Sequence, residues 1–175
     1  SSGNWNDETK QGQNIQIGNP SNDKPPPVIL VHGFQRKGEY DPRGIWESTA
    51  QVIANNTTFE EVQVRYTGGT HSFFWKAEKN TGGFRDIYIS NYNPEATPTF
   101  SDIRLYAENL KREISQARID SGVNRVNIVA HSMGGLITRA YVENDDFDEN
   151  PYTTNYRNDV SKLIMLGTPN HGVSL

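Results

Sequence analysis

Short aliphatic runs recur along the chain and are separated by longer amphipathic stretches. These runs predict strands at Val28–Val31, Ile87–Ile89, Val126–Ala130 and Leu163–Leu166. A continuous apolar run such as the first is typical of a strand buried on both faces of a parallel sheet, and the third run, interrupted only by Asn127, is interpreted in the same way. Residues 61–66 alternate instead between polar and apolar, which predicts a strand with one exposed face.

Apolar residues at helical spacing predict helices between these strands. One covers residues 44–55, and another covers residues 136–143 after the third apolar run. The longest follows Ser101, a residue type that caps helix N-termini, and stops at Gly122. Its apolar face consists of Ile103, Tyr106, Leu110, Ile114 and Ala117. Strands that alternate with helices predict an α/β fold, with a mostly parallel sheet and helices on both faces.

Two segments fall outside this alternation. Residues 1–27 are polar and end in three prolines, which predicts a lead-in before a single domain over residues 28–175. A glycine-rich stretch over residues 67–84 predicts a loop, within an insertion at about residues 67–100. An aromatic cluster in this loop fits either a hydrophobic lid or a small core beneath the loop. It consists of Phe73, Phe74 and Trp75.

The composition argues against several classes of protein. The 175 residues include 17 Lys and Arg against 21 Asp and Glu, a net charge of −4, so no nucleic-acid partner is predicted. The longest aliphatic runs are about four residues, where a membrane span needs roughly 20, so no transmembrane segment is predicted. Cysteine is absent from the sequence, which excludes disulfides and thiolate metal sites, and no cofactor is predicted. Abundant Asn, Thr and Tyr with few lysines favour a secreted protein.

One acidic segment leaves two interpretations open. Asp146, Asp148 and Asn150 have the spacing of the first three ligands of a calcium-binding loop. However, Pro151 stands where that loop needs glycine, and Arg157 stands where it needs the bidentate glutamate. The segment is therefore interpreted as a solvated acidic loop, with a calcium site of another geometry as the alternative.

Ser132 lies in the strongest candidate for a catalytic motif. The sequence Ala130-His131-Ser132-Met133-Gly134 joins a predicted strand to a predicted helix, with a small residue two positions before and after the serine. A sharp strand-to-helix turn requires small residues there, and it presents the serine hydroxyl beside the first N–H groups of the helix. The segment resembles the nucleophile elbow of the α/β-hydrolases. A serine that only caps the helix is the alternative.

Two further motifs extend this resemblance over Pro27–Gly172. The first predicted strand is followed by His32-Gly33-Phe34, which is similar to the H-G-x loop of lipases. The last predicted strand is followed by Gly167-Thr168-Pro169-Asn170-His171-Gly172, which is similar to their G-T-P-x-x-G loop. The chain is therefore identified as a lipase- or esterase-like member of the α/β-hydrolase superfamily.

The resemblance assigns roles to residues around the serine. The backbone N–H groups of Phe34 and Met133 are expected to form the oxyanion hole, which stabilises the charge on the substrate carbonyl oxygen. His32 and His131 are expected to be structural rings rather than proton carriers. The implied activity is cleavage of acyl or lipid esters through an acyl-enzyme on Ser132. A thioesterase, amidase or polyester hydrolase with the same nucleophile, or a non-catalytic hydrolase-like fragment, are the alternatives.

The order of the triad in this superfamily is Ser, then Asp or Glu, then His. Asp159 and His171 follow Ser132 earlier than the family's acid and base do. The chain is therefore expected to be the N-terminal portion of the hydrolase fold, with the remaining C-terminal part as its partner. The strand at Leu163–Leu166 should then have an open edge or a neighbour from other residues. A compact variant that uses His171 as the base is the alternative.

Overall fold

The computed structural model describes residues 24–34, 41–54, 59–66, 71–77, 86–93, 103–143 and 156–172. The polar lead-in up to residue 23 and Ser101 lie outside these residues. So do the calcium candidates Asp146, Asp148 and Asn150. None of the described helices is long and apolar enough to cross a membrane.

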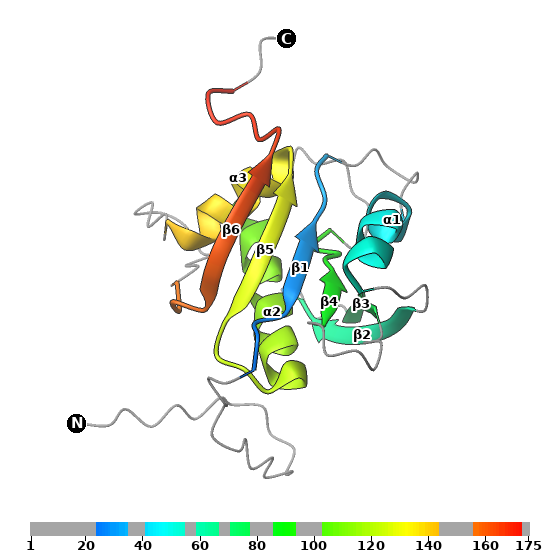
Figure 1. The fold of residues 1–175 in the computed structure, drawn as a ribbon. Helices are drawn as coiled ribbons and strands as arrows, with labels where there is room; N and C mark the ends of the chain where they lie inside the picture. Colours follow the sequence, from blue (N-terminus) through cyan, green and yellow to red (C-terminus); the bar gives the residue numbers. More distant parts are fainter. Residues whose placement is uncertain are drawn as a thin grey trace, which may run out of the picture.

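Strands of the described residues form one mixed sheet in the order β2-β3-β4-β1-β5-β6 (Figure 1). Their bounds are β1 Val28–Val31, β2 Phe59–Arg65, β3 His71–Ala77, β4 Ile87–Ile89, β5 Val126–His131 and β6 Val160–Leu166. The neighbours β4, β1, β5 and β6 run parallel, whereas β3 pairs antiparallel with both β2 and β4. The predicted α/β fold with a mostly parallel sheet is confirmed.

Helices cover both faces of this sheet. Helix α1 (Arg43–Ala54) lies on one face, and α2 (Ile103–Ser121) and α3 (Met133–Val142) lie on the other (Figure 1). The apolar run of β1 is uninterrupted because its side chains are buried on both faces of the sheet. Leu30 packs in the core on the α1 side, and Ile29 packs in the core on the α2 side. Gly122 ends α2 with a φ of +64°, a conformation that glycine adopts without a Cβ clash.

The prediction of a loop over residues 67–84 is wrong for residues 71–77, which form β3. Two observations explain the difference. β3 hydrogen-bonds to a strand on each side, and Trp75 is buried in the core beneath α1. The buried position of Trp75 favours the core interpretation of the aromatic cluster for this residue. The pairing and burial that stabilise β3 involve residues distant in sequence, so the local pattern of residues 71–77 does not predict the strand.

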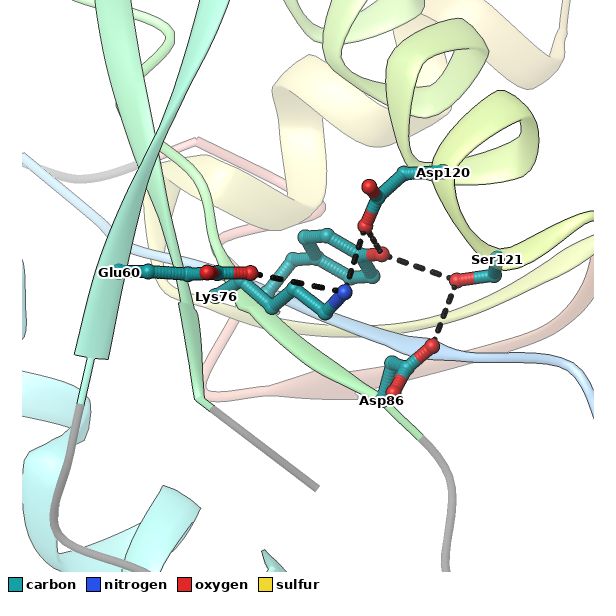
Figure 2. A network of polar contacts seen from close by, with 6 residues as sticks. Glu60, Lys76, Asp86, Asp120 and Ser121 are labelled. Atoms are coloured by element: carbon teal, nitrogen blue, oxygen red, sulfur yellow. Dashed lines mark hydrogen bonds and ion pairs between the residues drawn. The ribbon is translucent and has the colours of Figure 1, made fainter.

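A polar network fastens the β2–β3 hairpin and the start of β4 to the end of α2 (Figure 2). Lys76 Nζ lies 2.8 Å from Asp120 Oδ2, and the Tyr88 hydroxyl donates to the same oxygen at 2.5 Å. The hydroxyl of Ser121 lies 2.9 Å from the Tyr88 hydroxyl and donates to Asp86 Oδ2 at 3.0 Å. These contacts join elements that are distant in sequence.

Within the described part of the chain, β6 pairs only with β5 and so forms an edge of the sheet. Ile164, Met165 and Leu166 are 54%, 39% and 45% exposed on it. An apolar strand with an open edge is one of the two arrangements that the sequence predicts for Leu163–Leu166. A neighbouring strand from other residues stays a prediction.

Candidate active site

Ser132 occupies the turn between β5 and α3 in a strained backbone conformation. Its φ and ψ are +54° and −126°, although residues with a Cβ rarely have a positive φ. The Ser132 N–H donates to Leu166 O at 2.8 Å, and the Ser132 carbonyl accepts from the Gly135 N–H at 3.0 Å. The turn is therefore held from both sides. A nucleophile elbow requires a strained residue that is held in place in this way.

Glycines bring the three sequence motifs into contact at this turn. A Cβ on Gly33 would lie 2.8 Å from Ser132 Cβ, so the loop after β1 packs directly against the serine. A Cβ on Gly134 would lie 2.3 Å from His32 O, and one on Gly135 would lie 2.0 Å from Thr168 Oγ1. A side chain at any of these positions would require a neighbouring group to shift. The loops after β1, β5 and β6 therefore converge around Ser132.

Phe34 and Met133, the predicted oxyanion donors, each adjoin a residue at this turn: Phe34 follows Gly33, which packs on Ser132, and Met133 follows Ser132 itself. Met133 is the first residue of α3, where the aligned peptide dipoles favour negative charge. Phe34 directly follows Gly33, and its side chain is half exposed. Their backbone N–H groups come from two separate elements that meet at the serine.

His32 is a buried neutral ring that contacts the loop after β1. Its side chain is fully buried, stacks on the Tyr92 ring at 4.1 Å, and places Nδ1 2.9 Å from Gly33 O. Burial lowers the pKa of His32 to about 4, so the ring is neutral near pH 7. A buried ring of this kind cannot exchange protons with a substrate. His131, by contrast, lies exposed beside the turn.

Residues 27–175 match the model of the palmitoyl protein thioesterase family. The chain belongs to this family of the α/β-hydrolase superfamily. A structure from Listeria innocua, the product of its gene lin2722, resembles the chain with a TM-score of 0.53 and 18% identity. The match covers 87% of this chain and 54% of the Listeria protein, so the chain spans about half the length of that relative. No match was found among curated proteins.

Neither Asp159 nor His171, the acidic residue and the histidine that follow Ser132, contacts it by a hydrogen bond among the described residues. Asp159 is buried at the start of β6, where it accepts from Tyr141 Oη at 2.7 Å and Arg118 Nη1 at 3.2 Å. Ser132 binds Leu166 at the other end of β6, about 20 Å away at the rise of a strand. His171 is exposed in the loop after β6, and no hydrogen bond joins it to Ser132 among the described residues.

Glu113 is a buried carboxyl that the sequence reading missed. It lies on the inner face of α2, fully buried, and accepts from Tyr66 Oη at 2.6 Å, the Asn91 N–H at 2.7 Å and the Ser90 hydroxyl. Burial raises the pKa of Glu113 to about 7. A signal was present, because position 113 continues the apolar helix face of Tyr106 and Leu110, where glutamate is unexpected.

Replacing Glu113 by glutamine should change how the stability of this protein depends on pH. The raised pKa means that the folded state favours the protonated carboxyl of Glu113. The contribution of this carboxyl to the free energy of unfolding is therefore complete below pH 4.5 and is lost as the pH rises through 7. Glutamine does not titrate. The unfolding free energy of wild type minus that of Glu113→Gln should therefore fall by about 3 kcal/mol from pH 4 to pH 8.

Urea unfolding at several pH values measures this difference. His32, whose pKa is shifted in the opposite direction, is present in both proteins and cancels from it. Glu47→Gln, on the exposed side of α1, controls for the loss of one negative charge. Parallel stability curves for wild type and Glu113→Gln would show that the buried carboxyl does not titrate in this range.

Proposed function

We propose that this chain carries the nucleophile and oxyanion hole of a hydrolase that cleaves acyl thioesters, and the corresponding oxygen esters, through an acyl-enzyme on Ser132. The strained turn at Ser132, with the His32-Gly33-Phe34 loop packed on its Cβ, carries the proposal. Membership of the thioesterase family favours the thioester as the preferred substrate. The oxygen ester follows from the same mechanism.

The proposed reaction begins when Ser132 Oγ attacks the carbonyl carbon of the acyl group. The negative charge that develops on the carbonyl oxygen is stabilised by the N–H groups of Phe34 and Met133. The carbon–sulfur bond then breaks, and the thiol leaves as a thiolate, which needs no proton because thiols have a pKa of about 8.5. Water hydrolyses the acyl-enzyme and releases the fatty acid.

A base must accept the proton of the Ser132 hydroxyl. In this superfamily the base is a histidine, which a carboxylate orients. We propose that both residues lie in the remainder of the hydrolase domain. The position of Asp159 at the far end of β6 and the exposure of His171 support this placement. The apolar residues exposed on β6 support it as well, since a further strand of the same domain would cover them.

A covalent probe tests the proposal on the full-length natural protein. A fluorophosphonate should attach to the peptide that contains Ser132, as mapped by mass spectrometry, because such probes react with activated serines. Heat-denatured protein is the control and should not react. An adduct on a different residue, or no adduct on the folded protein, would favour the non-catalytic alternative.

The substrate class is tested by comparing two substrates with one acyl chain. A palmitoyl thioester of N-acetylcysteamine and the p-nitrophenyl ester of palmitate differ only in the leaving group. We expect a higher kcat/KM for the thioester, with free thiol release measured for the thioester and p-nitrophenolate release measured for the ester. Hydrolysis of the ester with none of the thioester would identify the protein as a carboxylic ester hydrolase.

A further inference from the structure

We propose that Tyr92 is a positioning residue that orients the Phe34 N–H toward the oxyanion by holding the carbonyl of Gly33. The inference rests on the proposed function, because it concerns the same oxyanion hole. Tyr92 lies after β4, on a different element from the loop that it contacts. It has no part in the chemistry itself.

The Tyr92 hydroxyl is committed to the backbone of the oxyanion loop. The side chain is fully buried, and its hydroxyl donates to Gly33 O at 2.8 Å, with His32 O 3.3 Å away. The flat face of the ring stacks on His32. Phenylalanine would fill the same core space without a hydroxyl that has to be desolvated. The hydroxyl of Tyr92 is therefore explained by the hydrogen bond that it donates to this loop.

Peptide geometry links this contact to the oxyanion donor. The carbonyl of Gly33 and the N–H of Phe34 belong to one peptide group, and the described residues contain only trans peptides. In a trans peptide the C=O and N–H point in opposite directions. Tyr92 pulls the Gly33 carbonyl to one side, so the Phe34 N–H faces the other. Within the described residues this N–H has no hydrogen-bond acceptor, so it is available for a substrate oxygen.

His32 reinforces the same orientation. Its Nδ1 also lies within hydrogen-bonding distance of Gly33 O. A carbonyl oxygen only accepts, so Nδ1 carries the proton and donates. Two side chains thus hold one carbonyl. Burial raises the pKa of Tyr92, so its hydroxyl keeps its proton near pH 7, and the neutral His32 ring donates through Nδ1.

Tyr92 is itself fixed by α2. Its backbone carbonyl accepts from Asn109 Nδ2 at 2.9 Å. The two residues before it, Ser90 and Asn91, both donate to the buried carboxyl of Glu113. The segment that presents the hydroxyl is therefore anchored to a long helix, which gives the positioning contact little freedom to move.

Tyr92→Phe tests the proposal in the full-length natural protein. The variant keeps the ring stack on His32 and removes only the hydroxyl. We expect kcat for the palmitoyl thioester to fall about 10- to 100-fold with KM within about twofold, since loss of a complete oxyanion donor costs about 10²–10³. The rate of fluorophosphonate labelling should fall in parallel.

Tyr141→Phe is the matched control. It also removes a buried tyrosine hydroxyl from a hydrogen bond, here to Asp159 at the far end of β6. If Tyr92 acts only through stability, the two variants should behave alike. If Tyr92 positions the oxyanion loop, Tyr141→Phe should keep the wild-type kcat.

A measurement without substrate reads the contact directly. The carbonyl ¹³C resonance of Gly33 should shift in Tyr92→Phe and stay unchanged in Tyr141→Phe, because only the first variant removes a donor from that oxygen. An unchanged Gly33 resonance, or an unchanged kcat in Tyr92→Phe while wild type hydrolyses the thioester, overturns the inference and leaves the proposed function standing. A wild type that neither hydrolyses substrate nor labels at Ser132 overturns the proposed function together with it.

Discussion

Ser132→Ala should lower kcat/KM for the proposed thioester substrate by about 10⁴-fold or more, because the proposed acyl-enzyme on Ser132 can no longer form. The side chain is partly exposed at the turn, so the fold should be retained. Hydrolysis assays of the full-length natural protein measure kcat/KM, and circular dichroism shows whether the fold is retained. Residual activity close to that of wild type would show that a different residue is the nucleophile.

Ser132→Gly should be equally inactive but more stable than Ser132→Ala by about 1–2 kcal/mol. Both variants lack the hydroxyl, and only the alanine variant keeps a Cβ at a φ of +54°. Glycine adopts that conformation without strain. For a residue with a Cβ, the same conformation costs of the order of 1–3 kcal/mol. Urea unfolding compares the two. Equal stabilities would mean that the turn stores no strain for the nucleophile.

The local pattern was sufficient to predict the parts of the fold that are buried on both faces. Val28–Val31 and Val126–Ala130 form adjacent central strands, so every side chain in each run meets a helix layer or the neighbouring strand. The three motifs around Ser132 were also predictable, because close backbone approach there demands small residues in sequence. These features depend on each residue's own size and polarity.

The features that sequence reading missed depend on partners far along the chain. Strand β3 is stabilised by pairing on both sides and by the buried ring of Trp75, not by alternation. Tyr92 contacts Gly33 across 59 positions, and Glu113 accepts from Tyr66 across 47. Nothing local distinguishes such a tyrosine from a core aromatic. The supports of the site therefore became visible only in the structure.

Gly134→Ala should be strongly destabilising, by about 3 kcal/mol or more. A Cβ at this position would lie 2.3 Å from His32 O and 2.9 Å from Val31 O. Both are backbone atoms at the end of β1, which is held between β4 and β5 and cannot shift without breaking its pairing. Overpacking against a rigid backbone is among the costlier core substitutions. Gly135→Ala should cost less, because the Thr168 atoms that it meets belong to a side chain that can rotate.

Gly44→Ala is the matched control for this prediction. Gly44 lies in the first turn of α1, and a Cβ there would meet no atom within 4 Å. The same substitution should therefore raise stability by up to about 1 kcal/mol, since alanine favours a helix over glycine. Urea unfolding followed by tryptophan fluorescence gives both values. If Gly134→Ala were as stable as Gly44→Ala, the elbow helix and the loop after β1 would be further apart than described, and the oxyanion hole proposed between them would lose its structural basis.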